Sequence, residues 1–290
     1  PAEAPPLTLT RKHIRGILQV TISAALLAVA LRQIHWSDVR AALTAIQPLW
    51  LALAFGLFLL GVVVRALRWQ ILLNALDVRR PLRELTLWFF VGSFFNVMLP
   101  TGFGGDVVRV IELSSDSGRT GAVVNSVIVD RYLGLMALLF MGLVASIARP
   151  DLAPPASVAL MAVFFVGGLV AAWLLSRPWW ARWSEGSGFA AKVIRSVRLP
   201  AIAASVGGYP AGVLGRALLV SFAFNFLQIG WNVAIAFGLG LWLPLPLFFA
   251  FVPLTAAALL LPSFGGLGVR ELTTVALLGP AGVPQAQALA

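Results

Sequence analysis

Long apolar runs separated by short polar segments dominate the chain. Five of them reach or approach the ~20 residues that a helix needs to cross the hydrocarbon layer of a bilayer. They are Ile14–Ile34, Leu49–Val64, Val123–Ile147, Val158–Leu175 and Leu218–Phe237. Two further runs, Leu85–Leu99 and Leu247–Leu261, would be only about 22 Å long as helices, which is short for a complete crossing. The pattern predicts an all-α polytopic membrane protein.

Composition supports this class and excludes several others. Of the 290 residues, 60% are hydrophobic and 11% charged, whereas a soluble domain has roughly a quarter of its residues charged. Cysteine is absent and the two histidines flank the first run, so we expect no disulfide, no metal site and no cofactor. The net charge of +10 is scattered between apolar runs, which argues against nucleic acid as a partner. We expect a piece of a longer protein, because the chain starts without methionine.

The basic residues predict how the chain is threaded. If the two short runs enter the membrane and turn back, and the N-terminus is cytoplasmic, fourteen Lys and Arg residues face the cytoplasm and four face the far side. Basic residues favour cytoplasmic loops. A full crossing by Leu85–Leu99, with a continuation that did not return, would instead place the basic linker 177–216 outside. We expect this linker to lie in the interface, with a solvated connector as the alternative.

Two glycine-rich segments follow the short runs and resemble each other. The segments Leu99–Arg109 and Leu261–Arg270 align with one gap as L-P-[TS]-F-G-G-x-x-V-R. Three predicted spans lie between them, so they would enter from opposite faces. The sequence therefore predicts a single transmembrane domain, 1–290, with an inverted-topology repeat and two broken re-entrant helical hairpins. The boundaries are 49–122 for repeat one with hairpin 85–117, and 217–279 for repeat two with hairpin 247–279.

The glycines of these segments have a physical reason to lie near a ligand. Proline removes a backbone donor and glycine permits unusual backbone angles, so the motif breaks a helix. Interrupted helices at membrane depth are tolerated only inside protein or beside a water-filled cavity. The freed N–H groups and the positive end of the next half-helix would form an anion site, as in transporters with inverted repeats. The glycines concerned are Gly104, Gly105, Gly265 and Gly266; a plain surface turn is the alternative.

Polar residues recur at helical spacing within two spans. Asn225 and Gln228 belong to a stripe with Ser221 and Asn232, which is either a wet face or an interhelical seam. A second stripe carries Asp130, and charges at such positions usually face a cavity or each other. Asp130 would then neutralise Arg131 or an arginine of the first hairpin.

Three arginines are the candidates for binding a phosphate, because a guanidinium matches phosphate oxygens and is always charged. They are Arg109, Arg131 and Arg270. Acidic residues would balance them or couple transport to protons: Asp106, Glu112, Asp130 and Glu271. Asn96 would donate to a headgroup or cap the broken helix. We interpret Arg65 and Arg68 with Trp69 as an interfacial anchor rather than as part of a substrate site.

These motifs, in this order, resemble those of one family of membrane domains. They are Arg65-x-x-Arg68-Trp69, Asn96-x-x-Leu99-Pro100 leading into Gly104-Gly105-Asp106-x-x-Arg109, Asp130-Arg131-x-x-Gly134-Leu135, and Pro262 followed by Gly265-Gly266-Leu267-Gly268-Val269-Arg270-Glu271. The chain resembles the transmembrane region of lysylphosphatidylglycerol synthase, a flippase-like family with stand-alone members. The resemblance implies movement of modified lipids between leaflets. No segment could be the soluble aminoacyl-transferring domain, which argues against lysylphosphatidylglycerol as the substrate.

We therefore expect a lipid flippase, and not an enzyme, that moves a phosphate-bearing lipid such as a polyprenyl-phosphate sugar, a glycolipid or a modified phospholipid. It would lie in a bacterial or archaeal cytoplasmic membrane with a cytoplasmic N-terminus. No phosphate-binding loop of the ATPase type occurs. The alternatives are a membrane-embedded transferase with Asp106 or Asp130 as base or metal ligand, and a non-transporting scaffold that binds lipid. The lipid, the direction of transport, the coupling ion and homo-oligomer formation stay open.

Overall fold

The computed structural model describes most of the chain after the first predicted span. The described residues are 40, 44, 46–98, 104–151, 154–176, 208–258, 269–279, 282–283 and 288. The predictions for 14–34, for the hairpin tips 99–103 and 261–268 with Gly265 and Gly266, and for residues 177–207 of the linker lie outside them. The described part is helical and contains no strand. Its helices are α3 (Pro48–Asn74), α4 (Leu82–Met98), α5 (Gly104–Ser117), α6 (Thr120–Ala148), α7 (Pro155–Ser176), α11 (Ala211–Gly238), α12 (Leu245–Ala258) and α13 (Val269–Leu278).

Four of these helices are long and apolar enough to cross a membrane, and each contains one predicted run. They are α3, α6, α7 and α11. Large apolar side chains are exposed along them, for example Phe55, Val163 and Leu219. Such a continuous apolar exterior is typical of helices that contact lipid tails. The prediction of an all-α polytopic membrane protein is confirmed.

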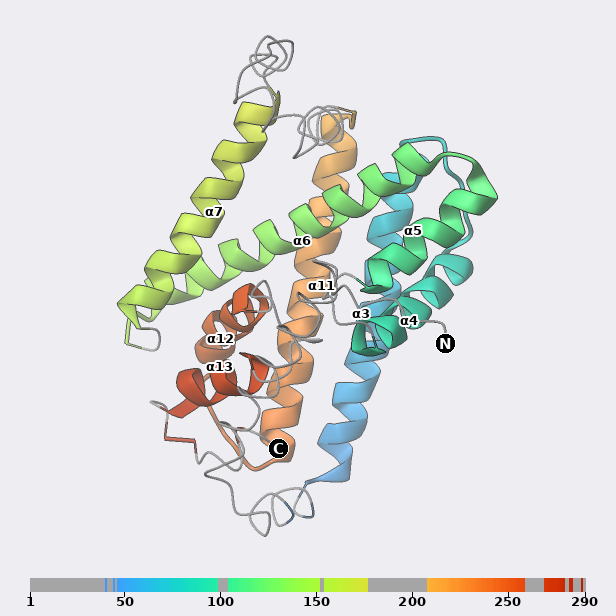
Figure 1. Ribbon diagram of the computed structural model, residues 1–290. Coiled ribbons are helices and arrows are strands. Elements are labelled where there is room, and N and C mark those ends of the chain that lie inside the picture. Colours follow the sequence, from blue (N-terminus) through green and yellow to red (C-terminus); the bar gives the residue numbers. More distant parts are fainter. Residues whose placement is uncertain are drawn as a thin grey trace, which may run out of the picture.

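Helices α3 and α11 form an antiparallel pair through the middle of the molecule (Figure 1). At one end the N–H of Gln47 donates to the carbonyl of Gly238 over 3.0 Å. At the other end Leu72 of α3 and Ala217 of α11 belong to the same buried cluster. The beginning of each helix therefore lies beside the end of the other.

Helices α4 and α5 pack together as a hairpin. The start of α4 and the end of α5 both lie near the C-terminal end of α3. Arg80, just before α4, forms a salt bridge with Asp116 near the end of α5. Arg119, which follows α5, donates to the carbonyl of Leu76 at 3.0 Å. The two helices approach so closely that a Cβ atom on Gly105 would overlap the carbonyl oxygen of Gly92. Glycine at both positions permits this contact.

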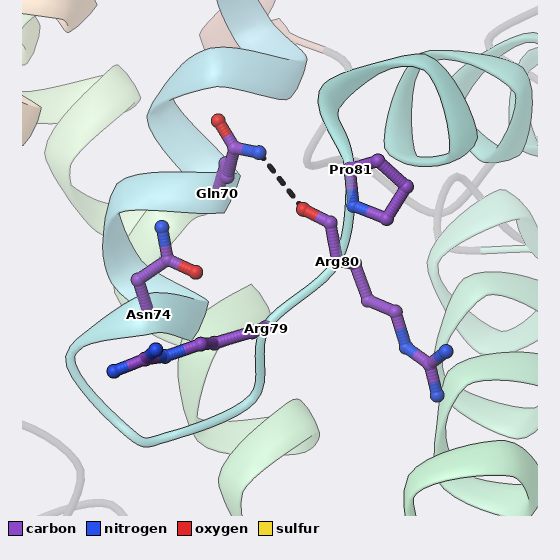
Figure 2. Close-up of a pocket in the computed structure, with 5 residues that line it drawn as sticks. All are labelled: Gln70, Asn74, Arg79, Arg80 and Pro81. Atoms are coloured by element: carbon purple, nitrogen blue, oxygen red, sulfur yellow. Dashed lines mark hydrogen bonds between the residues drawn. The ribbon is translucent and has the colours of Figure 1, made fainter.

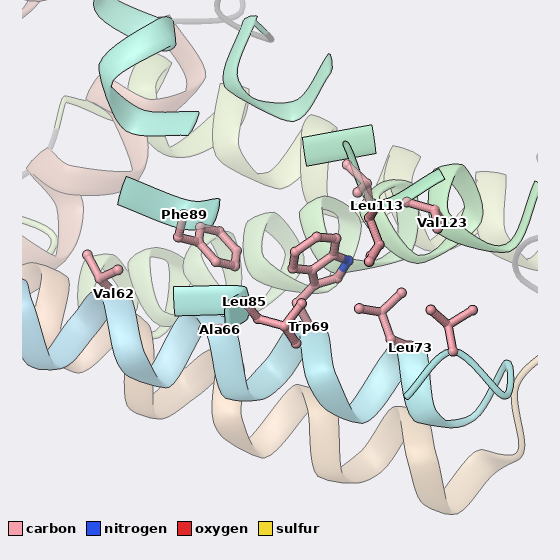
Figure 3. Packing of buried hydrophobic residues seen from close by; sticks show 10 residues of the cluster. Val62, Ala66, Trp69, Leu73, Leu85, Phe89, Leu113 and Val123 are labelled. Carbon is pink, nitrogen blue, oxygen red and sulfur yellow. The ribbon is translucent and has the colours of Figure 1, made fainter. Parts of the chain in front are cut away.

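An apolar core fastens this hairpin to α3 and α6 (Figure 3). Trp69 lies at its centre with no exposed surface, and its ring makes an edge-to-face contact with Phe89 of α4 at 5.7 Å. Leu113 of α5 and Val123 of α6 complete the core around it. The hairpin is thus supported by two long helices rather than lying loosely on the surface.

Helix α6 runs obliquely across the bundle and contacts both hairpins (Figure 1). It packs against α5 in its first half and against α12 in its second half, where Gly142 lies under Pro253 of α12. Helices α12 and α13 are in contact, and Leu247 at the start of α12 shares a buried cluster with Leu278 at the end of α13. The inverted repeat and its boundaries stay a prediction.

Candidate functional site

A buried ion pair joins three of the long helices. Arg68 of α3 donates from Nε to Oδ1 of Asp130 on α6 at 2.6 Å, and its Nη1 donates to Oγ of Ser221 on α11 at 3.0 Å. The side chains of Arg68 and Asp130 are 2% and 0% exposed. Asp130 is ten residues into α6, which places the pair about 15 Å from that end of the helix. Charged groups this deep in an apolar bundle are costly and usually functional.

A second carboxylate, Asp106, holds two arginines at the start of α5. Its two oxygens accept hydrogen bonds from Arg109, one turn further along α5, and from Arg131 of α6. Arg109 is only 2% exposed, whereas the side chain of Arg131 is 34% exposed. Arg131 is therefore the more exposed of the two arginines that Asp106 binds.

Aromatic rings hold the guanidinium groups in place. Cζ of Arg109 lies 3.9 Å from the ring centre of Phe89 and 4.9 Å from that of Trp69. Cζ of Arg65 lies 5.0 Å from the same Phe89 ring. Trp69 is fixed in turn, because its Nε1 donates to Oγ of Ser126 at 2.9 Å. Cation–π contacts of this kind stabilise a cation without neutralising it.

We refer to Arg65, Arg68, Arg109, Arg131, Asp106 and Asp130 as the arginine cluster. Within it, Arg109 lies close enough to the other three arginines and to Asp130 for their charges to act on it. The cluster contains four guanidinium groups and two carboxylates, so it carries an excess of two positive charges.

Some buried polar atoms of the arginine cluster have no hydrogen-bond partner among the described residues. These atoms are Nε of Arg65, Nη1 of Arg109 and Oδ2 of Asp130. A buried donor without an acceptor is destabilising. The two free donors and the positive excess together fit an anion with several acceptor oxygens.

The structure corrects two predictions about this region. Arg68 and Trp69 are not an interfacial anchor, because they are buried between helices at 2% and 0% exposure. Asp130 does pair with an arginine, but that arginine is Arg68 of α3, which is neither Arg131 nor part of the first hairpin. The sequence does contain a signal for the burial of Arg68 and Trp69. Arg65, Arg68 and Trp69 follow the apolar run 49–64 without a helix-breaking residue, so they belong to the same membrane helix.

The remaining candidates differ in where the structure places them. Asn225 is buried and donates to the carbonyl of Gly134 at 3.1 Å, so the start of its stripe is an interhelical seam beside the arginine cluster. Gln228 is half-buried further along α11, and Glu112 is exposed on α5. Gly104 and Gly105 are buried beside Asp106. The side chains of Asn96, Arg270 and Glu271 lie outside the described part, although their backbones belong to α4 and α13.

A separate pocket of about 560 Å³ lies where α3 ends and α4 begins (Figure 2). Its lining consists of Gln70, Asn74, Arg79, Arg80 and Pro81. Gln70 donates to the carbonyl of Arg80 at 2.8 Å, which holds the loop against α3. None of these residues belongs to the arginine cluster. Among the described residues, no group of three or more His, Cys, Asp or Glu side chains could hold a metal ion.

Comparison with known proteins identifies a family of membrane domains. The family model described as the lysylphosphatidylglycerol synthase TM region matches residues 16–290. The chain therefore belongs to this family of membrane domains, which are associated with flippase-type and synthase-type functions in lipid metabolism. Searches of curated proteins and of solved structures gave no match.

Proposed function

We propose that the protein moves a phosphate-bearing lipid between the two leaflets of a bilayer, with the headgroup bound by the arginine cluster. The observation that carries this proposal is a positive charge in the apolar bundle that the carboxylates of the arginine cluster do not compensate. The cluster contains four guanidiniums and two carboxylates, and Arg65 and Arg109 each retain a buried donor that has no acceptor among the described residues. A phosphate supplies both the missing charge and the missing acceptors.

The arrangement of the helices supports a carrier in which the two hairpins approach the ligand from opposite faces. Helices α3 and α11 are antiparallel, and each is followed by a hairpin, α4–α5 or α12–α13. Helix α6 contacts both hairpins. Rocking of one hairpin and its long helix against the other would expose the site to each leaflet in turn, as in other inverted-repeat transporters. Arg270 at the start of α13 is the proposed counterpart of Arg109, and Glu271 beside it is the acidic residue of the second hairpin.

The charges also suggest how transport would be driven. A headgroup with negative charge is driven by the membrane potential, at about 2.3 kcal/mol per charge and 100 mV. Asp106, Asp130, Glu112 and Glu271 are the candidates for coupling to protons. We place the protein in a cytoplasmic membrane, with membrane lipid as its partner.

A membrane-embedded transferase is the rival from another class. Both carboxylates that it would use as base or metal ligand, Asp106 and Asp130, are already bound to arginines. Arginine-bound carboxylates are poor bases, since the cation stabilises the ionised form. The geometry therefore favours binding over catalysis.

Reconstitution separates these functions. Purified protein is inserted into liposomes that contain a tail-labelled anionic lipid in both leaflets, and a membrane-impermeant quencher then reports how fast inner-leaflet lipid reaches the outer leaflet. A carrier predicts exchange well above that of protein-free liposomes and no new lipid product. Product formation with a polyprenyl-phosphate sugar and no exchange would show a transferase, and binding without exchange would show a scaffold.

A further inference from the structure

The charge balance of the arginine cluster restricts the kind of phosphate that fits it. In the described part of the chain, the cluster carries two positive charges more than its carboxylates neutralise. Arg270 and Glu271, which begin α13, have opposite charges and leave the sum unchanged if both join the site. We infer that the preferred cargo is a lipid whose headgroup is a phosphate monoester, which has two negative charges, rather than a phosphodiester, which has one. This inference rests on the proposed function.

The physical reason is that charge left over in a low-dielectric interior is costly. A monoester neutralises the excess completely, whereas a diester leaves one guanidinium without a counter-charge. A free phosphoryl group ionises a second time with a pKa near 6 in phosphorylated side chains. Nearby guanidiniums favour the doubly charged form further. The monoester is thus a dianion at neutral pH, and more so once bound.

The arrangement of donors also suits a terminal phosphoryl group. The two donors that lack an acceptor within the described part of the chain belong to different helices, Nε of Arg65 on α3 and Nη1 of Arg109 on α5. Both guanidiniums pack against the ring of Phe89, and Arg131 exposes part of its side chain beside Arg109's partner Asp106. A terminal phosphoryl has three unesterified oxygens for these groups. A diester has only two, and its second ester arm would need room among buried aromatic rings.

The comparison is made with lipids that have identical labelled tails and differ only in the headgroup. Phosphatidic acid provides the monoester, phosphatidylglycerol the diester, and phosphatidylcholine a headgroup without net charge. Exchange is measured for each at pH 7.5, and the rate in protein-free liposomes is subtracted. We expect phosphatidic acid to exchange at least about tenfold faster than phosphatidylglycerol, since close charge pairs at buried sites couple by more than a factor of ten.

A charge-altering variant and a pH series test the cause of the preference. Arg65→Gln lowers the excess to one charge and should reduce the preference for the monoester, whereas Arg149→Gln removes an exposed arginine outside the cluster and should not. Lowering the pH toward 5 should also reduce the preference, because the free monoester then carries about one charge and must lose a proton to bind as the dianion. The pH series uses the wild-type protein, so it tests the charge-based preference for the monoester even if Arg65→Gln does not fold.

The possible results separate this inference from the proposed function. Faster exchange of phosphatidic acid, reduced at low pH, supports the monoester. Equal rates for the two anionic lipids, or faster exchange of phosphatidylglycerol, would overturn the monoester preference while the carrier function stands. If no anionic lipid exchanges faster than in protein-free liposomes, the proposed function itself fails.

Discussion

Arg68 donates from Nε to Oδ1 of Asp130 across 2.6 Å, and neither side chain is more than 2% exposed. Through its second bond to Ser221, the same guanidinium connects α3, α6 and α11. A Cβ atom on Gly134 would lie 2.7 Å from Nη1 of Arg68, so the neighbouring turn of α6 leaves just enough room for this group. The Arg68–Asp130 pair therefore contributes to the bundle both through its charges and through its close packing against α6.

Removal of one partner of this pair should strongly destabilise the protein. Asp130→Ala leaves the charge of Arg68 buried without its carboxylate, and such changes cost about 3–5 kcal/mol. The measurement is thermal unfolding of the purified protein in detergent, followed by tryptophan fluorescence. Asp151→Ala breaks the exposed pair with Arg149 and serves as the control, for which we expect little change. Equal effects of the two variants would contradict the assignment of Asp130 as a structural counter-charge.

The close approach of α4 and α5 can be tested with alanine. Gly105→Ala places a methyl group against the backbone of Gly92, and overpacking of this kind typically costs about 1–3 kcal/mol. Gly121→Ala, in α6, is the matched control because nothing lies within 4 Å of its added Cβ. The control should be neutral or slightly stabilising, as alanine is the better helix former. A Gly105→Ala protein with unchanged thermal stability would show that the hairpin is not packed in this way.

Asp106 should act as the internal competitor of the ligand. Asp106→Asn removes the counter-charge of Arg109 and Arg131, and each charged hydrogen bond contributes about 1.5–3 kcal/mol, so the empty protein should be less stable. Adding phosphatidic acid should then raise the unfolding temperature more in the variant than in the wild type. Equal or smaller stabilisation of the variant would mean that the headgroup binds away from Arg109 and Arg131.

Much of this architecture could be predicted from the sequence, because bilayer thickness sets the length of each apolar run. The runs 49–64, 123–147, 158–175 and 218–237 all lie within described helices. The pairing of Arg109 and Arg131 with one carboxylate could not be foreseen, since it depends on how α5 packs against α6. The burial of Arg68 and Trp69 between helices could not be foreseen either. Their charge and aromatic character suggested the membrane surface, and only the packing of α3 against α6 and α11 places them inside.

The re-entrant path of the first hairpin can be tested by chemical labelling, because the chain has no native cysteine. Single cysteines are introduced at Asn74, the last residue of α3, and at the exposed Ser115, near the end of α5. A third is placed at Asp151, beyond the far end of α6. Impermeant maleimide should label positions 74 and 115 from the same side of the membrane and position 151 from the opposite side. Labelling of 74 and 115 from opposite sides would mean that the hairpin crosses completely.

The central claim is that the buried arginines carry a lipid phosphate across the bilayer, and lipid exchange in liposomes with Arg109→Ala tests it most directly. Arg149→Ala is the matched control, because it removes an exposed arginine from outside the arginine cluster. Loss of one charged hydrogen bond of about 1.5–3 kcal/mol predicts that Arg109→Ala slows exchange of an anionic lipid by about tenfold or more. The control should match the wild type. Exchange by a correctly folded Arg109→Ala protein at the wild-type rate would contradict the account.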